Sequence, residues 1–362
     1  MKRLLVVAAL AAMITGLMAL EPQHLQFEHV GWFRYTNVST SFGITDPDVS
    51  RFGLERGYLR TGYQWTDKLY TKFTVDIYSS DITTEGSTVR IKEAYVDFAL
   101  PIKDFFFTAG LQKHYFGLIY SWNYLDPGKS LSDEFGVAAS ADYGLTINGK
   151  LPNKLGELQL GLYNGEGYRY VNKCVNTTPE LLANVRLTPI KNLMIGGSVM
   201  HHGEDNRRAE EDRTGILGLA VPMLVSAGPF TLLGEFNSLD YTAETGPDTL
   251  RVSRKHSQSG FDIFPSITVL DRKLDAFVRF SSWARRVEQE DGGMKLNEAR
   301  SVYRYGAGAN WHFYRRSGGR RPGCAFQLAW TRTQARAEGS DPKDTIMAQF
   351  RFEWAALIPP AK

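Results

Sequence analysis

The connections along this chain alternate in length. About sixteen amphipathic, strand-like segments are joined in turn by tight turns and by longer polar links. The tight turns are 65–68, 101–104, 189–192 and 270–273. The longer links are 39–50, 81–87, 114–135, 165–179, 203–212, 242–255 and 289–300. In bacterial barrels short turns face the periplasm and long loops face outward. The alternation therefore predicts a transmembrane antiparallel β-barrel of about 16 strands with both chain ends on the short-turn side.

Side-chain polarity within the segments alternates with a period of two, which is the period of a β-strand. In the segment 72–78, Phe73, Val75 and Ile77 lie on one face, opposite Lys72, Thr74 and Asp76. The same pattern extends over 137–148 and over 346–354. Runs of about ten residues suit a tilted strand that crosses a bilayer, whereas strands of a soluble sandwich are usually about five or six residues long. We expect the apolar face to meet lipid and the polar face to line a wet interior.

The first nineteen residues have the composition of a secretory signal peptide. Lys2 and Arg3 precede an apolar run that ends at Ala19, and polar Glu21 follows. We expect cleavage after Ala19, so that 1–19 is the signal peptide and 20–362 is an outer-membrane β-barrel reached through the periplasm. A membrane anchor is the alternative, but the apolar run is short for a spanning helix.

The overall composition excludes several classes of protein. With 43% hydrophobic residues and a mean hydropathy of −0.28, the chain is too polar for a helical membrane protein. A formal charge of +3 is too small to indicate nucleic-acid binding. The two cysteines, Cys174 and Cys324, fall in an outer loop and beside a periplasmic turn, so we expect no disulfide between them.

The region from Glu55 to about Leu125 carries three further motifs. An Arg-rich strand, L-E-R-G-Y-L-R-T-G-Y, is followed by E-A-Y-V-D-F at 93–98 and by G-L-Q-K…F-G-L at 110–118. In this order and spacing they resemble the phosphate-selective porin O/P family of outer-membrane porins. The resemblance implies a sixteen-stranded barrel, usually a trimer, whose third long loop folds inward and narrows the pore.

The third long loop departs from the phosphate-selective members of that family. Between His114 and Phe135 it contains Lys129, but also Asp126, Asp133 and Glu134. Phosphate held in a narrow pore needs several convergent cations, and a carboxylate among them repels the ligand. The mixture argues against a strong phosphate site and leaves a weak anion preference.

If the apolar faces meet lipid, a set of charged residues points into the barrel, since an arginine facing lipid at mid-bilayer would cost about 2–4 kcal/mol. The candidate pore-lining residues are Arg56, Arg60, Lys72, Asp76, Glu93, Asp97, Arg186, Arg279, Arg304 and Arg351, and Glu353 joins them. These charges either select solutes or pair across strands and merely keep the wall wet.

The candidate constriction loop supplies a second set of residues: Lys113, His114, Tyr115, Tyr120, Trp122, Asp126 and Lys129. Its aromatic residues leave open a pore for sugars or organic anions, or they pin the loop to the wall by apolar packing. Other aromatic residues lie near strand ends and are candidates for interfacial girdles. These are Trp32, Tyr63, Trp65, Phe105, Tyr303, Trp311, Phe313 and Trp354.

The remaining motifs carry less chemistry. The run from His201 to Asp205 contains metal-binding residue types, but neighbouring strand residues face opposite sides, and we predict no metal site. The basic run 315–321 is expected to be a turn near lipid headgroups. The last strand is expected to end before Leu357, because Pro359 and Pro360 cannot continue a ladder.

The sequence thus favours a passive diffusion porin, with no cofactor and no catalytic activity, in the outer membrane of a Gram-negative-type cell. Its expected partners are membrane lipid, small anions or other hydrophilic solutes, the barrel-assembly machinery and two further copies in a homotrimer, and not nucleic acid. The alternatives are a barrel enzyme with a Ser and His near one interface, and an adhesive barrel with a plugged lumen.

Overall fold

The computed structural model describes residues 24–39, 49–79, 87–122, 128–169, 178–205, 212–245, 252–315 and 322–358. The expected signal peptide, Asp126, Cys174 and most of the basic run 315–321 lie outside these residues. No helix among the described residues is long and apolar enough to cross a membrane.

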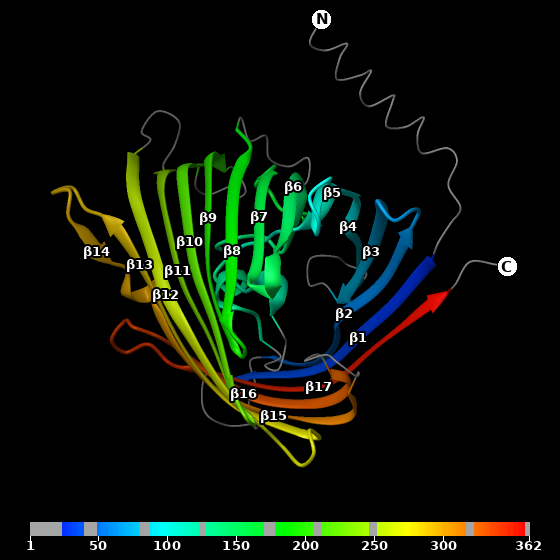
Figure 1. Ribbon diagram of the computed structural model, residues 1–362. Coiled ribbons are helices and arrows are strands. Elements are labelled where there is room, and N and C mark those ends of the chain that lie inside the picture. The colour runs from blue at the N-terminus through cyan, green and yellow to red at the C-terminus, as the bar shows by residue number, and fades with distance from the viewer. Residues whose placement is uncertain are drawn as a thin grey trace, which may run out of the picture.

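The chain forms one closed antiparallel sheet (Figure 1). Its strands are β1 His24–Ser39, β2 Val49–Gln64, β3 Leu69–Ser79, β4 Ser87–Ala99, β5 Phe105–Lys113, β6 Ala141–Leu151, β7 Gly156–Tyr163, β8 Glu180–Ile190, β9 Leu193–Asp205, β10 Asp212–Ala227, β11 Phe230–Thr245, β12 Val252–Val269, β13 Leu274–Glu288, β14 Met294–Leu296, β15 Val302–Arg315, β16 Pro322–Ala335 and β17 Lys343–Ile358. Short helical turns are η1 Ile119–Ser121, α2 Leu131–Glu134, η2 Pro152–Lys154 and η3 Glu298–Arg300.

Closure of the sheet comes from its first and last strands. β1 pairs with both β2 and β17. In Figure 1, β1 is drawn blue and lies beside β17, which is red. The three-residue β14 pairs with the end of β13, and β15 continues the wall beside β13. The result is the predicted all-β, sixteen-stranded barrel. Short connections at one end alternate with long links at the other, and the two ends are called here the short-turn end and the long-link end.

The period-two alternation becomes two different surfaces. On β6, Tyr143, Leu145 and Ile147 are exposed on the outside, whereas Asp142 and Thr146 are buried in the interior. β17 repeats the pattern, with exposed Phe350 and Trp354 alternating with buried Gln349, Arg351 and Glu353. An apolar outer surface of this kind is stable against lipid tails, and the polar interior satisfies its groups through hydrogen bonds and ion pairs.

Three predicted strand boundaries were wrong. β6 begins at Ala141 and not at Val137, because Val137 still donates its N–H to Ser132 O at 2.9 Å in the preceding turn. β17 continues to Ile358, which pairs with Leu25, so the strand extends past the expected end. Lys113 is the last residue of β5 and does not belong to the loop that follows.

Two β-bulges change which residues face inward. Trp32 pairs with Arg56 while Phe33 pairs with Leu54, and Glu55 is the extra residue. A second bulge, between Thr74 and Val75 of β3, leaves Lys92 as the extra residue of β4. A bulge places two consecutive residues on one side of the sheet. Lys92 and Glu93 accordingly line the same interior cavity.

One girdle assignment was also wrong. Trp32 is 2% exposed and packs in the barrel interior with Val30 and Tyr58, so it cannot face lipid. Its inward direction follows from the parity of β1, on which Phe33 is exposed on the other side. Trp65, Trp311, Phe313 and Trp354 are exposed on the outer surface, as girdle residues would be.

Residues 114–122 and 128–140, which we call the inward segment, fold into the barrel as expected (Figure 1). Phe116, Ile119 and Leu131 are buried in a cluster with residues of the inner wall, including Leu182 and Ile216. Leu118 and Trp122 pack in a second cluster with Leu233, Phe264 and Phe277. Burial of this apolar surface against the β8–β13 wall drives the inward fold.

Candidate pore constriction

An interior cavity of about 220 Å³ lies between the inward segment and the wall formed by β17 and β1–β5. Its charged lining residues are Glu28, Arg56, Arg60, Lys72, Lys92, Glu93, Lys113, Arg351 and Glu353. Six of these are cations and three are carboxylates. The potential of this wall is therefore positive, even though acidic groups are present.

Each carboxylate of the cavity lies beside a cation. Glu28 pairs with Arg60 at 3.1 Å and Glu93 with Lys72 at 2.8 Å. Arg351 and Glu353, on one strand, approach within 3.4 Å. Pairing across strands, one of the two alternatives for these charges, thus occurs here. The two pairs across strands and the pair within β17 involve three of the six cations.

The basic wall is interleaved with aromatic rings. The guanidinium carbon of Arg56 lies 4.3 Å from the centroid of the Trp32 ring and 5.1 Å from that of Tyr58. The guanidinium carbon of Arg351 lies 4.9 Å from the centroid of the same Trp32 ring, and that of Arg60 lies 4.6 Å from the centroid of Tyr58. Such cation–aromatic contacts stabilise the positive charges against the rings of the inner wall.

The facing wall of the cavity is the tip of the inward segment, with Ile119, Tyr120 and Trp122. The Tyr120 hydroxyl donates a hydrogen bond to Glu157, and the Arg186 guanidinium lies 4.0 Å from its ring. Burial raises the pKa of Tyr120 well above its ordinary value, although Arg186 opposes the shift, so the phenol stays neutral. The cavity is thus cationic on one side and mostly aromatic and apolar on the other.

Three predicted lumen arginines bind the inward segment. Arg186 donates to Ser121 Oγ at 2.7 Å and to the Gly117 carbonyl. Arg279 donates to the Lys129 carbonyl at 2.8 Å and pairs with Asp262. Arg304 pairs with Glu134 at 2.6 Å. These residues point into the barrel, but their guanidinium groups hold the constriction in place.

A buried carboxylate completes this attachment. Glu235 of β11 accepts hydrogen bonds from Leu118 N at 2.6 Å and from Ser132 Oγ at 2.9 Å. Nothing in the alternation of β11 distinguishes Glu235 from a solvated lumen residue. Its partners are more than a hundred residues away in the chain, so the sequence did not indicate its role.

Other predicted site residues lie away from the cavity. Asp76 is buried near the Tyr168 hydroxyl, at 3.4 Å, and Asp97 accepts a hydrogen bond from Thr108. Asp97 and Tyr115 line a separate interior cavity of about 150 Å³, and Lys113 lines both cavities. His114 is 1% exposed and hydrogen-bonded to Glu180 at the base of the inward segment. Lys129 is partly exposed and lies 4.0 Å from Asp133.

Seven residues of the cavity were missed as site candidates: Glu28, Val30, Trp32, Tyr58, Lys92, Ile119 and Ser140. Tyr58 lies on the same face of β2 as Arg56 and Arg60, and Glu28 lies on the same face of β1 as Trp32. The alternation of polarity could therefore have indicated both residues. Lys92 could not have been found in this way, because the bulge in β4 breaks the alternation at that residue.

The ionisation state of Glu134, which pairs with Arg304, depends mainly on that arginine. Burial opposes ionisation of Glu134, but Arg304, Lys129 and Arg279 lower its pKa below the ordinary 4.5. Glu134 is therefore a carboxylate at neutral pH, and the ion pair with Arg304 is formed. This pair joins α2 of the inward segment to β15.

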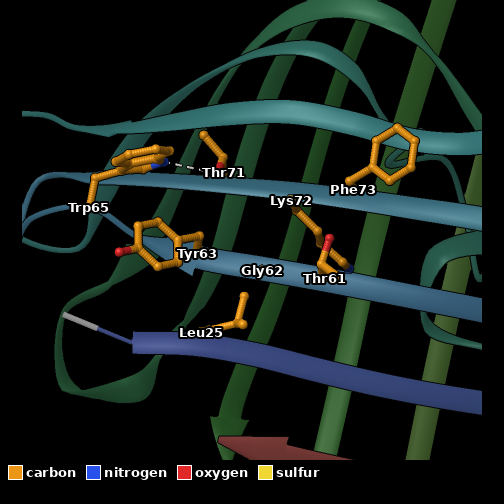
Figure 2. A pocket seen from close by; sticks show the side chains of 8 residues that line it. All are labelled: Leu25, Thr61, Gly62, Tyr63, Trp65, Thr71, Lys72 and Phe73. Carbon is orange, nitrogen blue, oxygen red and sulfur yellow. Dashed lines mark hydrogen bonds between the residues drawn. The ribbon is translucent and has the colours of Figure 1, made fainter. Parts of the chain in front are cut away.

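A different hollow, of about 310 Å³, opens on the outer surface near the short-turn end of β1–β3. Figure 2 shows Leu25, Tyr63, Trp65 and Phe73 around it. The indole of Trp65 donates to Thr71 Oγ1 at 3.0 Å, and its ring meets that of Tyr63 edge-on at 4.6 Å. Amphipathic rings at a strand end are typical of the membrane interface.

No cluster of metal-ligating side chains occurs in the part of the chain that the structure describes. His201 is exposed, and its Nδ1–H donates a hydrogen bond to the Ile216 carbonyl, whereas the neighbouring His202 is buried. The two imidazoles therefore lie on opposite faces of β9, as the strand period requires.

No protein-family model matches the sequence, and no curated protein matches it. The fold, however, is similar to that of several solved outer-membrane proteins. The outer membrane channel DcaP of Acinetobacter baumannii has a TM-score of 0.63 at 13% identity, over 91% of this chain and 96% of that chain. An anion-selective porin from Comamonas acidovorans has a TM-score of 0.61 at 10% identity, over 92% and 100%. The trimer form of OmpT, an outer membrane protein of Vibrio cholerae, has a TM-score of 0.59 at 10% identity, over 92% and 100%. At these identities the likeness shows the fold alone.

Proposed function

We propose that the protein is a passive diffusion channel for small hydrophilic solutes, with a preference for anions, in the outer membrane of a Gram-negative-type cell. The observation that carries the proposal is the interior cavity, on which six cations and three carboxylates face an inward-folded constriction. A narrow, positively charged opening in an otherwise closed barrel favours passage of small anions over cations.

The outer surface supports the membrane location. Exposed leucine, isoleucine, valine and phenylalanine side chains cover the outer faces of β6–β13, where each would be costly in water but stable in hydrocarbon. Residues 1–19 would then be a cleaved signal peptide and 20–362 the mature barrel. The trimer form of OmpT, which shares the fold, supports a homotrimer.

Within the channel we assign two roles. Arg56, Arg60, Lys72 and Arg351, with Glu93, line the path of the solute. Arg186, Arg279 and Arg304 set the width of the path, because they hold the inward segment against the wall. Carboxylates beside the cavity cations favour a general anion preference over a strong phosphate site, since each repels a multiply charged anion.

The test is planar-bilayer recording of the refolded, heat-modifiable barrel under a gradient of potassium chloride. Stepwise currents whose reversal potential is shifted toward the equilibrium potential of chloride would support the proposal. A reversal potential shifted toward the equilibrium potential of potassium would refute the anion preference but not the proposal that the barrel is a channel. Absence of current from correctly folded protein would refute the channel and favour a catalytic or adhesive barrel.

A further inference from the structure

The interior cavity of about 150 Å³, which we call the polar cavity, differs in charge from the cavity at the constriction. It has one carboxylate, that of Asp97, and one ammonium, that of Lys113. The cavity at the constriction has six cations and three carboxylates. The polar cavity reaches toward the short-turn end, because Asp97 is the third residue from the end of β4 and Phe106 is the second residue of β5.

Phe106 presents an aromatic ring to the interior of the barrel. Its strand partner is Asn148, whose amide donates to Thr108 Oγ1 at 2.9 Å, and Thr108 in turn donates to Asp97. These four side chains therefore share the inner face. The Phe106 ring is 37% exposed, and no aromatic ring or cation in the described part of the chain packs on it. An apolar ring that stays exposed inside a polar channel is a surface that a solute can cover.

Three polar groups of the polar cavity have hydrogen-bonding capacity that the protein does not use. Tyr95 and Tyr115 are partly exposed, and neither hydroxyl bonds to a residue that the structure describes. The Asp97 carboxylate accepts from Thr108 through Oδ1, and no described residue donates to Oδ2. A phenol both donates and accepts, whereas a carboxylate oxygen accepts. The three groups together can therefore bind several hydroxyl groups of one solute.

The charges around the polar cavity favour neither an anion nor a cation. Lys72 and Lys113 both act electrostatically on the Asp97 carboxylate. An anion bound there would be repelled by Asp97, and a cation would be repelled by the two ammonium groups. A neutral solute avoids both costs and still makes the hydrogen bonds.

A neutral sugar ring matches this arrangement. A pyranose carries hydroxyl groups around its rim and C–H groups on its faces, so one face can bury against Phe106 while rim hydroxyls reach Asp97 and the two tyrosines. The cavity of about 150 Å³ has the volume of about five water molecules in the liquid, which suits one small ring better than a chain of several.

We propose that the polar cavity is a binding subsite for an uncharged monosaccharide. The proposal rests on the proposed channel function and adds a class of solute to it. The subsite lies beside the base of the inward segment, where Lys113 lines both cavities, so a sugar bound there obstructs the path of other solutes.

The experiment measures block of the potassium chloride current through single channels of the refolded protein. Glucose has the ring, sorbitol has similar hydroxyl groups on an open chain, and glucosamine in its ammonium form adds a positive charge to the ring. We expect glucose to reach half-block at a concentration roughly threefold or more below that of sorbitol, which is the factor given by burial of about 25 Å² of apolar surface. Glucosamine should block less than glucose.

Variants of Phe106 test the contact with the sugar face. Phe106→Leu removes the ring and should bring the ratio of sorbitol to glucose half-block concentrations to about one. Phe106→Tyr keeps the ring and should keep the ratio. The matched control is Phe236→Leu, which removes a phenylalanine that is 45% exposed on the outer surface and should leave the ratio unchanged.

The two tyrosine hydroxyls provide a test that does not disturb the fold. The double variant Tyr95→Phe/Tyr115→Phe keeps both rings and loses hydroxyl groups that bond to no described residue. The half-block concentration of glucose should rise about two- to tenfold, as expected for the loss of one or two net hydrogen bonds. Chloride-to-potassium permeability should stay at the wild-type value, because no charge changes.

Three outcomes would overturn the subsite: equal block by glucose and sorbitol in the wild type, stronger block by glucosamine than by glucose, or wild-type glucose block in the folded double variant. Absence of any current from the wild type would instead refute the channel. Saturation-transfer NMR of glucose with the folded barrel would then test the subsite without a current, and no transfer to the sugar would refute it. The two failures are thereby distinguished.

Discussion

The carboxylate of Glu235 accepts a hydrogen bond from the backbone N–H of Leu118, with 2.6 Å between Oε1 and N. This contact joins β11 to the tip of the inward segment, 117 residues earlier in the chain. It shows that the constriction is held by specific polar bonds and not only by apolar packing. The position of the inward segment therefore depends on the opposite wall.

Substitution of Glu235 should widen the channel. Hydrogen bonds to a charged group contribute about 1.5–3 kcal/mol each, and Glu235→Ala removes those made to Leu118 and Ser132. We expect larger and noisier single-channel conductance, with a smaller effect in Glu235→Gln, which can still accept one bond. Asp240→Asn, exposed on the same strand, is the matched control. Unchanged conductance in folded Glu235→Ala would contradict the role of Glu235 in holding the inward segment.

Removal of a cavity arginine should lower anion preference. A unit charge about 4 Å from a passing ion contributes about 1 kcal/mol in water, so Arg56→Ala or Arg60→Ala should reduce the chloride-to-potassium permeability ratio about two- to fivefold. Reversal potentials in a salt gradient measure this ratio. Lys154→Gln, in an exposed turn, removes a positive charge elsewhere and should have no effect. Wild-type reversal potentials in both arginine variants would exclude these residues from the selectivity of the channel.

Acid should loosen the inward segment at Glu134. The folded-state pKa of Glu134 is lowered by Arg304, so the ion pair stabilises the folded loop above the ordinary pKa of 4.5. That contribution is lost as pH falls through the lower folded-state value, where the carboxyl becomes protonated. We expect current noise to increase below pH 4.5 in the wild type and to be high already at pH 7 in Glu134→Gln. Equal pH dependence in the two proteins would assign the effect to other groups.

Gly110 should be essential for assembly of the barrel. Its φ is +122°, and an added Cβ would lie 2.4 Å from Ala94 O and 3.0 Å from Tyr95 Cα on the paired strand. Gly110→Ala would force β4 and β5 apart, since both colliding atoms belong to backbone. We expect a large loss of heat-modifiable, folded protein on gels. Gly197→Ala, where the added Cβ meets no atom within 4 Å, should fold normally.

The cost of a charge on the outer surface should depend on depth. Leu145 lies in the middle of β6 and Ile190 at the short-turn end of β8, and both are exposed on the outer face. In a bilayer, Leu145→Arg should lower the free energy of unfolding by about 2–4 kcal/mol and Ile190→Arg by about 1 kcal/mol or less. Reversible denaturation in lipid vesicles measures both. Equal costs at the two positions would argue against a membrane at this surface.

The number of strands, the order of short and long connections and the identity of the outer face were predictable from the sequence. All three depend on local information: a period of two in polarity, and turn residues between the runs. Tyr143, Leu145 and Ile147 on β6 illustrate this, because any strand with that sequence has one apolar face. The inward third loop was expected from the resemblance of the motifs between 55 and 125, and the structure has it.

The direction of Lys92, and the partners of Trp32 and of the interior arginines, were decided by the tertiary structure. Lys92 faces the interior because β3 and β4 pair with a bulge, and a bulge is a property of two strands together. Trp32, beside a second bulge, is enclosed by arginines from β2 and β17, which the polarity of β1 does not reveal.

The sequence by itself therefore determined the two faces of each strand outside its bulges and the closed barrel that the strands form, because side-chain direction in a regular strand depends only on parity. Tertiary structure decided which interior charges line the cavity and which bind the inward segment. The inward direction and the positive charge of Arg56 and Arg60 are shared by Arg186, Arg279 and Arg304. These last three nevertheless bind the inward segment. That difference arises from where the inward segment packs, and its packing depends on residues such as Glu235, which are brought near only when the barrel closes.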